Sequence, residues 1–439
     1  MPKLAINGGA RVREAPFPAY NAIGAEEEAA ALRVLRSGRL SSFIGSWHPD
    51  FLGGSEVRAL EAEWAKTFGV RHAVSVNSAT SGLFCAVGAA HISPGDEVIV
   101  SPYTMSASAV AAVVYGGIPV FADVEPDYFC LDPGSVEACI TPKTRAIIVV
   151  DLFGHPYDAE RINAIATKHG ITVIEDAAQA PGAMHGKRAA GTLADMGVYS
   201  LNFHKHIHTG EGGVVVTDDD RLAERLRLIR NHAEAVLGAR PGGATRDELI
   251  NMVGFNYRMT EIGCAIAREQ LKKLPALLDA REKNVAYLAK KLAEIPCIAP
   301  AKTRPGCRHA FYVHALTFDE KQAGVERKRF VDAVKAELPR TLMREDSDVL
   351  ISTGYVRPLY LQPMYQERIA IGRDGWPFTL TERTYRKGLC PVTERLHERE
   401  LVTHEMFRPP MTPRDLDAVA EAFHKVWENR AELNSGSGA

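Results

Sequence analysis

The chain has 439 residues, with 52 lysines and arginines against 54 aspartates and glutamates, so its formal net charge is −2. The chain therefore lacks the excess of positive charge that would attract the phosphates of a nucleic acid, which argues against DNA or RNA binding. With 46% hydrophobic and 24% charged residues, the chain has enough apolar material for one large and one smaller unit.

Between residues 70 and 220, short apolar runs alternate with patterns of helical spacing. Strands are expected at 72–76, 97–101, 119–122, 146–150 and 171–175, and helices at 81–90, 106–115, 135–140 and 158–169. Short apolar strands that alternate with helices predict a mostly parallel sheet between two helix layers, an α/β fold. Ligands of such sheets bind at the carboxyl ends of the strands, where segments 77–81, 102–105 and 176–179 fall.

The pattern changes towards the C-terminal part of the chain. A helix is expected within 256–295, with Thr260 as its N-cap, and strands and amphipathic helices follow at 311–318, 326–338 and 413–427. We therefore expect a large domain with an N-terminal arm over 1–295 and a smaller C-terminal α+β domain over 296–433. Residues 434–439 have linker composition and are expected to be disordered.

The location of the protein is predicted from features that it lacks. Its seven cysteines are scattered without CxxC spacing, which favours reduced thiols over a disulfide framework. The first residues lack the long apolar stretch of a signal peptide, and no run approaches the ~20 apolar residues of a membrane helix. We expect a cytoplasmic protein with no membrane partner.

One lysine and one aspartate suggest the chemistry. Lys205 lies in a tight loop between two strand-like runs, 196–200 and 214–217, and a glycine-rich turn follows it. Such a lysine can attack a carbonyl. Asp176 ends an apolar strand about 30 residues upstream, and pyridoxal phosphate (PLP) needs a Schiff-base lysine with an acidic partner for its ring nitrogen. The alternative for Lys205 is an ordinary lysine in a surface loop, and the alternative for Asp176 is the N-cap of a helix.

Segments 173–183, 200–213 and 254–261 together resemble the DegT/DnrJ/EryC1/StrS family of PLP-dependent sugar aminotransferases. The resemblance runs from about residue 5 to about residue 425. It implies a fold-type I PLP-dependent transferase, in which the large α/β/α domain over 1–295 binds the cofactor.

The resemblance also assigns roles at the cofactor ring. It implies that Lys205 holds PLP as an internal aldimine and moves the proton, while Asp176 keeps the ring nitrogen protonated. Gln179 resembles the family glutamine near the phenolic oxygen of the cofactor. Without the resemblance, Gln179 would be read as a polar residue on a first helical turn.

A second group of residues is expected at the cofactor phosphate. Ala79 and Thr80 align with the phosphate-binding pair, and backbone N–H groups at a helix N-terminus suit a phosphate. Ser200 aligns with a phosphate-binding serine. Asn256 matches the asparagine that reaches the phosphate from the neighbouring subunit, which implies a homodimer with shared active sites. The alternative for Asn256 is a turn residue after Gly254.

Two positions depart from the family pattern. Met105 stands where an aromatic residue stacks on the cofactor ring; a thioether can cover a π-face, or Tyr103 takes that place. Tyr360 stands where many relatives carry histidine. We expect substrate contacts from Tyr360, Tyr257 and His206, although His206 is also compatible with simple packing.

Three alternating histidines, at 204, 206 and 208, invite comparison with a metal site. The interposed Lys205 and the glycine-rich turn fit a cofactor loop better, and no acidic or cysteine partner repeats the spacing. We therefore expect no metal. The turn at 210–213 lacks the strand-to-helix context and the lysine spacing of a nucleotide-binding loop.

The resemblance implies an aminotransferase that moves an amino group from L-glutamate or L-glutamine to a keto-sugar or keto-cyclitol. A minority branch of the family carries histidine at the position of Lys205 and dehydrates its sugar. Residues 4–13 and 390–394 are similar to relatives acting on free cyclitols such as scyllo-inosose, although nucleotide-sugar enzymes dominate the family. The alternatives are a nucleotide-sugar dehydratase, an aminohydroxybenzoate-synthase-like enzyme, and a PLP-binding regulator without turnover.

Overall fold

The computed structural model describes residues 3–239, 243–341 and 348–434. A seven-stranded sheet in the order β1-β9-β8-β5-β4-β2-β3 forms the centre of the larger unit. Its strands are β1 (His72–Val76), β2 (Glu97–Val100), β3 (Ile118–Phe121), β4 (Thr144–Val150), β5 (Thr172–Asp176), β8 (Met196–Ser200) and β9 (Gly213–Thr217). Only β9 runs antiparallel to its neighbours in this sheet, so the predicted mostly parallel sheet is confirmed.

Helices cover both faces of the large sheet because its strands are apolar on both faces. Val98 and Val100 of β2 pack in one cluster with α3, α4 and α7, whereas Ile99 between them faces the cluster of α5 and α6. The helices of the larger unit are α1 (Ala25–Ser37), α2 (Ser55–Phe68), α3 (Ala79–Ala89), α4 (Ala107–Val114), α5 (Pro133–Cys139), α6 (Ala159–His169), α7 (Asp220–Arg230) and α8 (Ala233–Leu237). Of these, α1 packs on the long helix α9 (Glu261–Leu292) and not on the sheet. A short three-stranded sheet of β6 (Met184–His185), β7 (Arg188–Ala189) and β11 (Cys307–Arg308) lies beside them.

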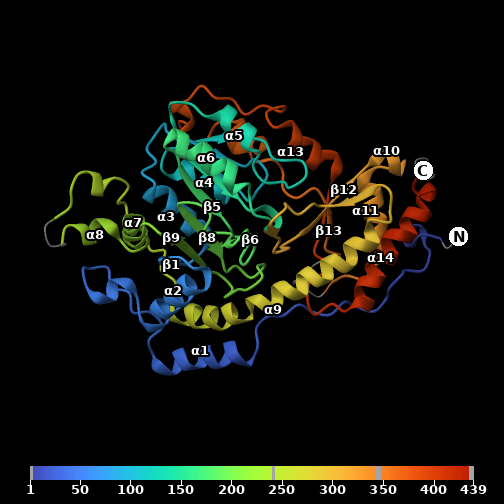
Figure 1. Cartoon of the computed structure of the whole chain (residues 1–439), viewed down its shortest axis with the longest axis horizontal. Coiled ribbons are helices and arrows are strands. Elements are labelled where there is room, and N and C mark those ends of the chain that lie inside the picture. Colours follow the sequence, from blue (N-terminus) through green and yellow to red (C-terminus); the bar gives the residue numbers. More distant parts are fainter. Residues whose placement is uncertain (1–2, 240–242, 342–347, 435–439) are drawn as a thin grey trace.

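The smaller unit has a four-stranded antiparallel sheet in the order β10-β12-β14-β13. Its elements are β10 (Ile298–Pro300), β12 (His314–Phe318), β13 (Ile351–Thr353), β14 (Leu401–His404), α10 (Glu320–Ala323), α11 (Arg327–Ala336) and α14 (Pro413–Glu428). Between β13 and β14 the chain also forms α12 (Pro363–Gln366) and α13 (Pro391–Arg395), which contact the larger unit. The long helix α9 (Glu261–Leu292) runs from α1 beneath the large unit to α14 in the smaller one (Figure 1). Thr260 caps it, as predicted, by accepting a hydrogen bond from the N–H of Gly263.

The two units do not follow the expected boundary at residue 296. Tyr360, Tyr365 and Phe378 belong to the core cluster of the large sheet, and the Tyr385 hydroxyl donates to the Pro119 carbonyl of β3 at 2.9 Å. The segment from about 359 to 390 therefore covers the β3 edge of the large sheet, because its aromatic side chains find their apolar partners there.

The N-terminal arm also departs from the expected division. Leu4 and Phe17 of the arm pack in the core cluster of the smaller unit. In addition, the Leu4 N–H donates to a Glu432 carboxylate oxygen at 3.3 Å, so the two ends of the chain lie together (Figure 1). The first part of the arm thus packs on the smaller unit, whereas the Tyr20 hydroxyl donates to the His206 carbonyl in the β8–β9 loop of the larger unit at 3.0 Å.

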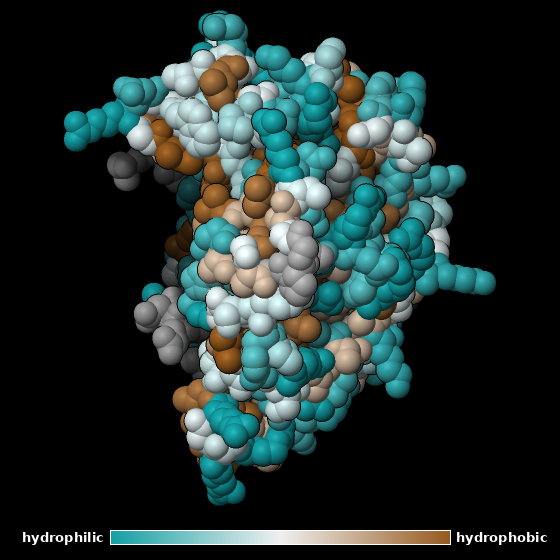
Figure 2. Space-filling model, turned by 90° about the vertical axis from the view of Figure 1, so that its left-hand side faces the viewer, coloured by the Kyte–Doolittle hydropathy of each residue, from teal (hydrophilic) through white to brown (hydrophobic). Residues whose placement is uncertain are grey.

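The surface at the α7–α8 end of the molecule mixes hydrophilic and hydrophobic residues (Figure 2). In the described parts of the chain, no helix combines the length and the apolar character needed to cross a membrane. Of the predicted disordered tail, residues 435–439 lie outside the described residues. Asn434 is described, and its side chain donates to the Gly324 carbonyl at 2.9 Å.

Candidate active site

The loop between β8 and β9 carries Lys205, as predicted. The loop closes on itself through hydrogen bonds from the Phe203 N–H to the Gly210 carbonyl and from the Lys205 N–H to the Asn202 carbonyl, each 2.9 Å long. Lys205 is half-buried, and its Nζ lies 4.4 Å from the centroid of the Tyr312 ring. The loop therefore holds the amine against the smaller unit.

Asp176 ends β5, the strand adjacent to β8, and is 6% exposed. Its carboxylate accepts hydrogen bonds from the Ser108 hydroxyl at 2.7 Å and from the Ala178 N–H at 3.2 Å. The chain continues as a turn, so the alternative of a helix N-cap does not occur. Burial raises the pKa of Asp176, while Ser108, the Ala178 N–H and the charge of Lys205 act in the opposite direction.

Gln179 connects the turn after β5 to both units. Its carbonyl oxygen accepts a hydrogen bond from the Phe153 N–H at 2.8 Å, and its amide nitrogen donates to the Tyr355 hydroxyl at 3.0 Å. Gln179 therefore does not lie on a first helical turn. The two bonds fix the orientation of the amide, which any role beside a cofactor ring requires.

The predicted phosphate-binding residues converge where β8 and β9 meet the start of α3. Ala79 and Thr80 are the first two residues of α3, and Ser78 caps the helix through a 3.0 Å bond from the Ser81 N–H. Ser200 at the end of β8 pairs with Gly213. A Cβ on Gly213 would lie only 2.8 Å from the Ala79 nitrogen, so glycine is what allows β9 to approach the helix so closely.

Asn256 and Tyr257 lie beside the same end of α3. The Asn256 side chain accepts a hydrogen bond from Arg258 Nε at 2.7 Å, and its carbonyl accepts one from the Asn77 side chain at 3.4 Å. The Tyr257 carbonyl accepts a bond from the Asn77 N–H at 2.8 Å, and its ring stacks on Phe255. Asn256 is exposed, and a contact to a neighbouring subunit stays a prediction.

Met105 and Tyr103 differ in how much surface they offer. The side chain of Met105 is 61% exposed, whereas Tyr103 is buried, and its hydroxyl accepts a hydrogen bond from the Tyr355 N–H at 2.9 Å. The alternative in which Tyr103 replaces Met105 over a cofactor ring would break this packing. Met105 is the better candidate for that position.

Two of the expected substrate residues are enclosed by protein. His206 is 0% exposed and bonds to the Ala310 carbonyl at 2.8 Å, and burial, followed by the charge of Arg281, lowers its pKa well below the usual value. Tyr360 is also 0% exposed, and its hydroxyl donates to the Glu394 carboxylate. The geometry therefore supports packing for both residues and not the predicted substrate contacts.

Three residues near the site were not predicted. Ser108 holds the Asp176 carboxylate, and Tyr312 and Tyr355 bring aromatic rings from the smaller unit to Lys205 and Gln179. Burial, followed by the charge of Tyr312, raises the pKa of Tyr355. A hydroxyl on the first turn of α4 could have suggested Ser108, but the sequence carries no signal for the two tyrosines.

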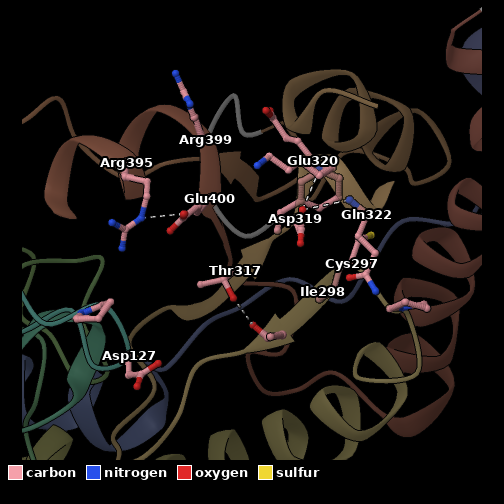
Figure 3. Close-up of a pocket in the computed structure, with 15 residues that line it drawn as sticks. Asp127, Cys297, Ile298, Thr317, Asp319, Glu320, Gln322, Arg395, Arg399 and Glu400 are labelled. Atoms are coloured by element: carbon pink, nitrogen blue, oxygen red, sulfur yellow. Dashed lines mark hydrogen bonds and ion pairs between the residues drawn. The ribbon is translucent and has the colours of Figure 1, made fainter. Parts of the chain in front are cut away.

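Two other features lie apart from this site. Within the described residues, no group of three or more His, Cys, Asp or Glu side chains is arranged to hold a metal ion. A cavity of about 690 Å³ lies between the smaller unit and Pro126 and Asp127 of the larger one, and Arg395 and Glu400 form a 2.8 Å ion pair on its wall (Figure 3). None of the predicted site residues lines this cavity.

The residues at the carboxyl ends of β5 and β8 and at the start of α3 have the chemistry needed to bind PLP. A buried carboxylate such as Asp176 is disfavoured unless a cation faces it, and the protonated ring nitrogen of PLP is such a cation. The N-terminus of α3 offers N–H groups to a phosphate. Lys205 supplies a primary amine in the loop that follows β8, and Met105 supplies an accessible apolar side chain.

Comparison with known proteins identifies the family of this chain. Residues 23–424 match the DegT/DnrJ/EryC1/StrS aminotransferase family. The spore coat polysaccharide biosynthesis protein SpsC of Bacillus subtilis is 31% identical, covering 92% of this chain and 95% of that protein. The L-glutamine:2-deoxy-scyllo-inosose aminotransferase of Streptoalloteichus tenebrarius is 32% identical, covering 98% and 99%. The crystal structure of DesI with its TDP-sugar product has a TM-score of 0.79 at 29% identity, and the match covers 98% of each chain.

Proposed function

Because this chain belongs to the DegT/DnrJ/EryC1/StrS aminotransferase family and is a PLP-dependent aminotransferase, we propose that it transfers the amino group of L-glutamine to a keto-cyclitol. L-Glutamate is the second candidate donor. The observation that supports the chemistry is that Asp176 ends β5 while Lys205 lies in the loop after the adjacent strand β8, close enough for its charge to act on Asp176. The acceptor is suggested by the inosose aminotransferase, which matches this chain over nearly its full length.

The residues divide the work between proton transfer and cofactor binding. When bound, PLP supplies an electron sink for the carbon that loses its proton. Asp176 favours a proton on the ring nitrogen, since a charge opposite the buried carboxylate compensates for its desolvation. Lys205 acts as the general base and acid. Ser108 orients the Asp176 carboxylate, and the N–H groups of Ala79 and Thr80 bind the phosphate.

An assay with matched acceptors tests the proposed substrate. Purified protein is supplied with PLP, L-glutamine and either 2-deoxy-scyllo-inosose, scyllo-inosose or a TDP-linked keto-sugar, and the products are identified by mass. We expect an aminocyclitol from an inosose and no product with Lys205→Ala. Turnover of the TDP-linked sugar alone would overturn the cyclitol acceptor. Loss of a hydroxyl without gain of nitrogen would identify a dehydratase.

We also propose that the protein is a homodimer in the cytoplasm in which Asn256 completes the active site of its partner. The exposed Asn256 side chain supports this assignment. Chains carrying Lys205→Ala or Asn256→Asp are mixed, refolded together and assayed. If Asn256 acts across the interface, mixed dimers regain one intact site and activity returns. If it acts within its own chain, every site in the mixture contains one altered residue and activity stays low.

A further inference from the structure

The last part of the N-terminal arm, just before α1, reaches the loop that carries Lys205. The arm passes alongside α9 on its way to α1 (Figure 1). The hydroxyl of Tyr20 in this part of the arm donates a hydrogen bond to the His206 carbonyl at 3.0 Å. Because His206 directly follows Lys205 in sequence, this bond holds the backbone of the loop one residue after the lysine.

A glutamine on α9 forms a second connection between the arm and the loop. Gln270 is 0% exposed, and its amide oxygen accepts a hydrogen bond from the His208 N–H at 3.1 Å. Its amide nitrogen donates to the Ala22 carbonyl of the arm at 2.8 Å and to a Glu27 carboxylate oxygen at 2.7 Å. One buried side chain therefore bonds to the loop and to the arm at the same time, so the two segments are joined at two points.

The loop is also held on the other side of Lys205. The Arg408 guanidinium of the smaller unit donates to the His204 carbonyl at 3.4 Å. Within the loop, the Lys205 N–H donates to the Asn202 carbonyl at 2.9 Å. With the Tyr20 bond, the backbone is thus fixed both before and after the lysine. This matters for chemistry because the orientation of a reacting group strongly affects the rate of its reaction.

The ring of Tyr20 places the hydroxyl. The buried guanidinium groups of Arg281 and Arg408 lie 5.8 Å and 5.7 Å from its centroid, within the range of cation–π contacts. A phenylalanine ring at this position would keep these contacts. Tyr20→Phe therefore removes the bond to the loop and leaves the packing of the arm in place.

We propose that Tyr20 is a positioning residue for Lys205. Its hydroxyl holds the loop in the conformation in which the lysine amine meets the aldehyde carbon of PLP. Tyr20 acts through the backbone of the loop, and the N-terminal arm thereby becomes part of the active site. This inference rests on the proposed function, in which Lys205 is the amine that bonds the cofactor.

The rate at which PLP attaches to Lys205 tests this proposal without an amino donor or acceptor. The full chain is freed of PLP with hydroxylamine and mixed with PLP at a series of concentrations. The amine and the aldehyde form a C=N bond with loss of water, and borohydride stops the reaction at intervals by reducing that bond. Mass spectrometry of the Lys205 peptide then gives a maximal rate and a half-saturating PLP concentration.

The proposal predicts which of these two quantities changes. We expect Tyr20→Phe to lower the maximal rate by about two- to tenfold, the equivalent of one hydrogen bond, and to leave the half-saturating concentration unchanged. Tyr385→Phe is the matched control, because it also removes a hydrogen bond from a tyrosine hydroxyl to a backbone carbonyl, that of Pro119 at 2.9 Å. It should keep the wild-type value of both quantities.

Three outcomes would overturn the proposal. A wild-type maximal rate in Tyr20→Phe would show that the hydroxyl does not orient the lysine. An equal fall in Tyr385→Phe would assign the effect to a general loss of stability. A raised half-saturating concentration at an unchanged maximal rate would assign the hydroxyl to PLP binding. If wild-type protein attaches no PLP to Lys205, the proposed function fails; if it does and Tyr20→Phe behaves like the wild type, only this inference fails.

Discussion

The two faces of the candidate site are built in different ways. The face formed by the larger unit contains Asp176 and Ser200, which are the last residues of their strands, and Lys205, which lies in the loop between β8 and β9. On the smaller-unit face, Tyr312 and Tyr355 arrive from connections more than a hundred residues away in sequence. The large-unit face is therefore set by local chain geometry, whereas the other depends on how two units pack together.

The largest expected effect lies on the large-unit face. Lys205→Ala removes both the amine that bonds the cofactor and the general base, so we expect amino transfer to fall by on the order of a thousandfold or more. The matched control is Lys187→Ala, an exposed lysine in the preceding hairpin, which should retain wild-type turnover. If both variants kept activity, the strand-end face would not contain the reactive amine.

Asp176→Asn should have opposite effects on activity and on stability. We expect amino transfer to fall by on the order of a hundredfold, because an amide does not favour a proton on the ring nitrogen. The cofactor-free variant should nevertheless have a higher free energy of unfolding than the wild type at neutral pH, since it no longer buries a carboxylate whose pKa is raised.

The pH dependence of that difference follows from the direction of the pKa shift. A raised folded-state pKa means that the folded wild type binds the proton more tightly than the unfolded chain, so it gains stability as the pH falls. The advantage of Asp176→Asn should therefore shrink between the raised folded-state pKa and the ordinary value of 3.8. Urea unfolding at several pH values measures it. If the difference in unfolding free energy between Asp176→Asn and the wild type became larger on acidification, the conclusion that burial raises the pKa of Asp176 would be wrong.

The smallest effects on turnover are expected from substitutions of two tyrosines in the C-terminal region, Tyr355 and Tyr360. Tyr355→Phe removes the acceptor of the 3.0 Å bond from Gln179, and we expect a drop in kcat of about tenfold or less with a small change in stability. Tyr360→Phe removes the bond to the buried Glu394 and should cost about 2 kcal/mol of unfolding free energy. Its KM for the acceptor should remain at the wild-type value.

Steady-state kinetics and urea unfolding, performed on both variants, compare the two positions directly. A raised acceptor KM in Tyr360→Phe without loss of stability would restore Tyr360 to the substrate site. An unchanged kcat in Tyr355→Phe would show that the Tyr355 hydroxyl has no role in turnover. Tyr312 would then be the remaining tyrosine of the smaller unit at the site.

The fold was largely predictable because its signals are local. The observed bounds of β1 and β8 coincide with the runs expected at 72–76 and 196–200, since buried strands read as uninterrupted apolar segments. Helix α3 begins two residues before the expected start at 81, because Ser78 caps it. The α/β class, the family, the enzyme class and PLP as cofactor are confirmed.

The site was predictable only where strand ends determine it. Asp176 and Ser200 lie at the same edge of the sheet because the adjacent parallel strands β5 and β8 end there. Tyr312 reaches Lys205 through hydrogen bonds to a turn more than 150 residues earlier, which no local pattern encodes. Tyr360 is expected at the substrate only because it stands where many relatives carry histidine, and a matching position does not show that its hydroxyl is buried against Glu394.

The central claim, that the β8–β9 loop carries the amine that bonds the cofactor, is tested most directly by borohydride reduction. The protein as purified with PLP is reduced and digested, and each lysine peptide is weighed by mass spectrometry. We predict that the reduced cofactor is attached to Lys205 and is absent from the digest of Lys205→Ala. Attachment to a different lysine, or no attachment to a protein that still transfers amino groups, would contradict the account.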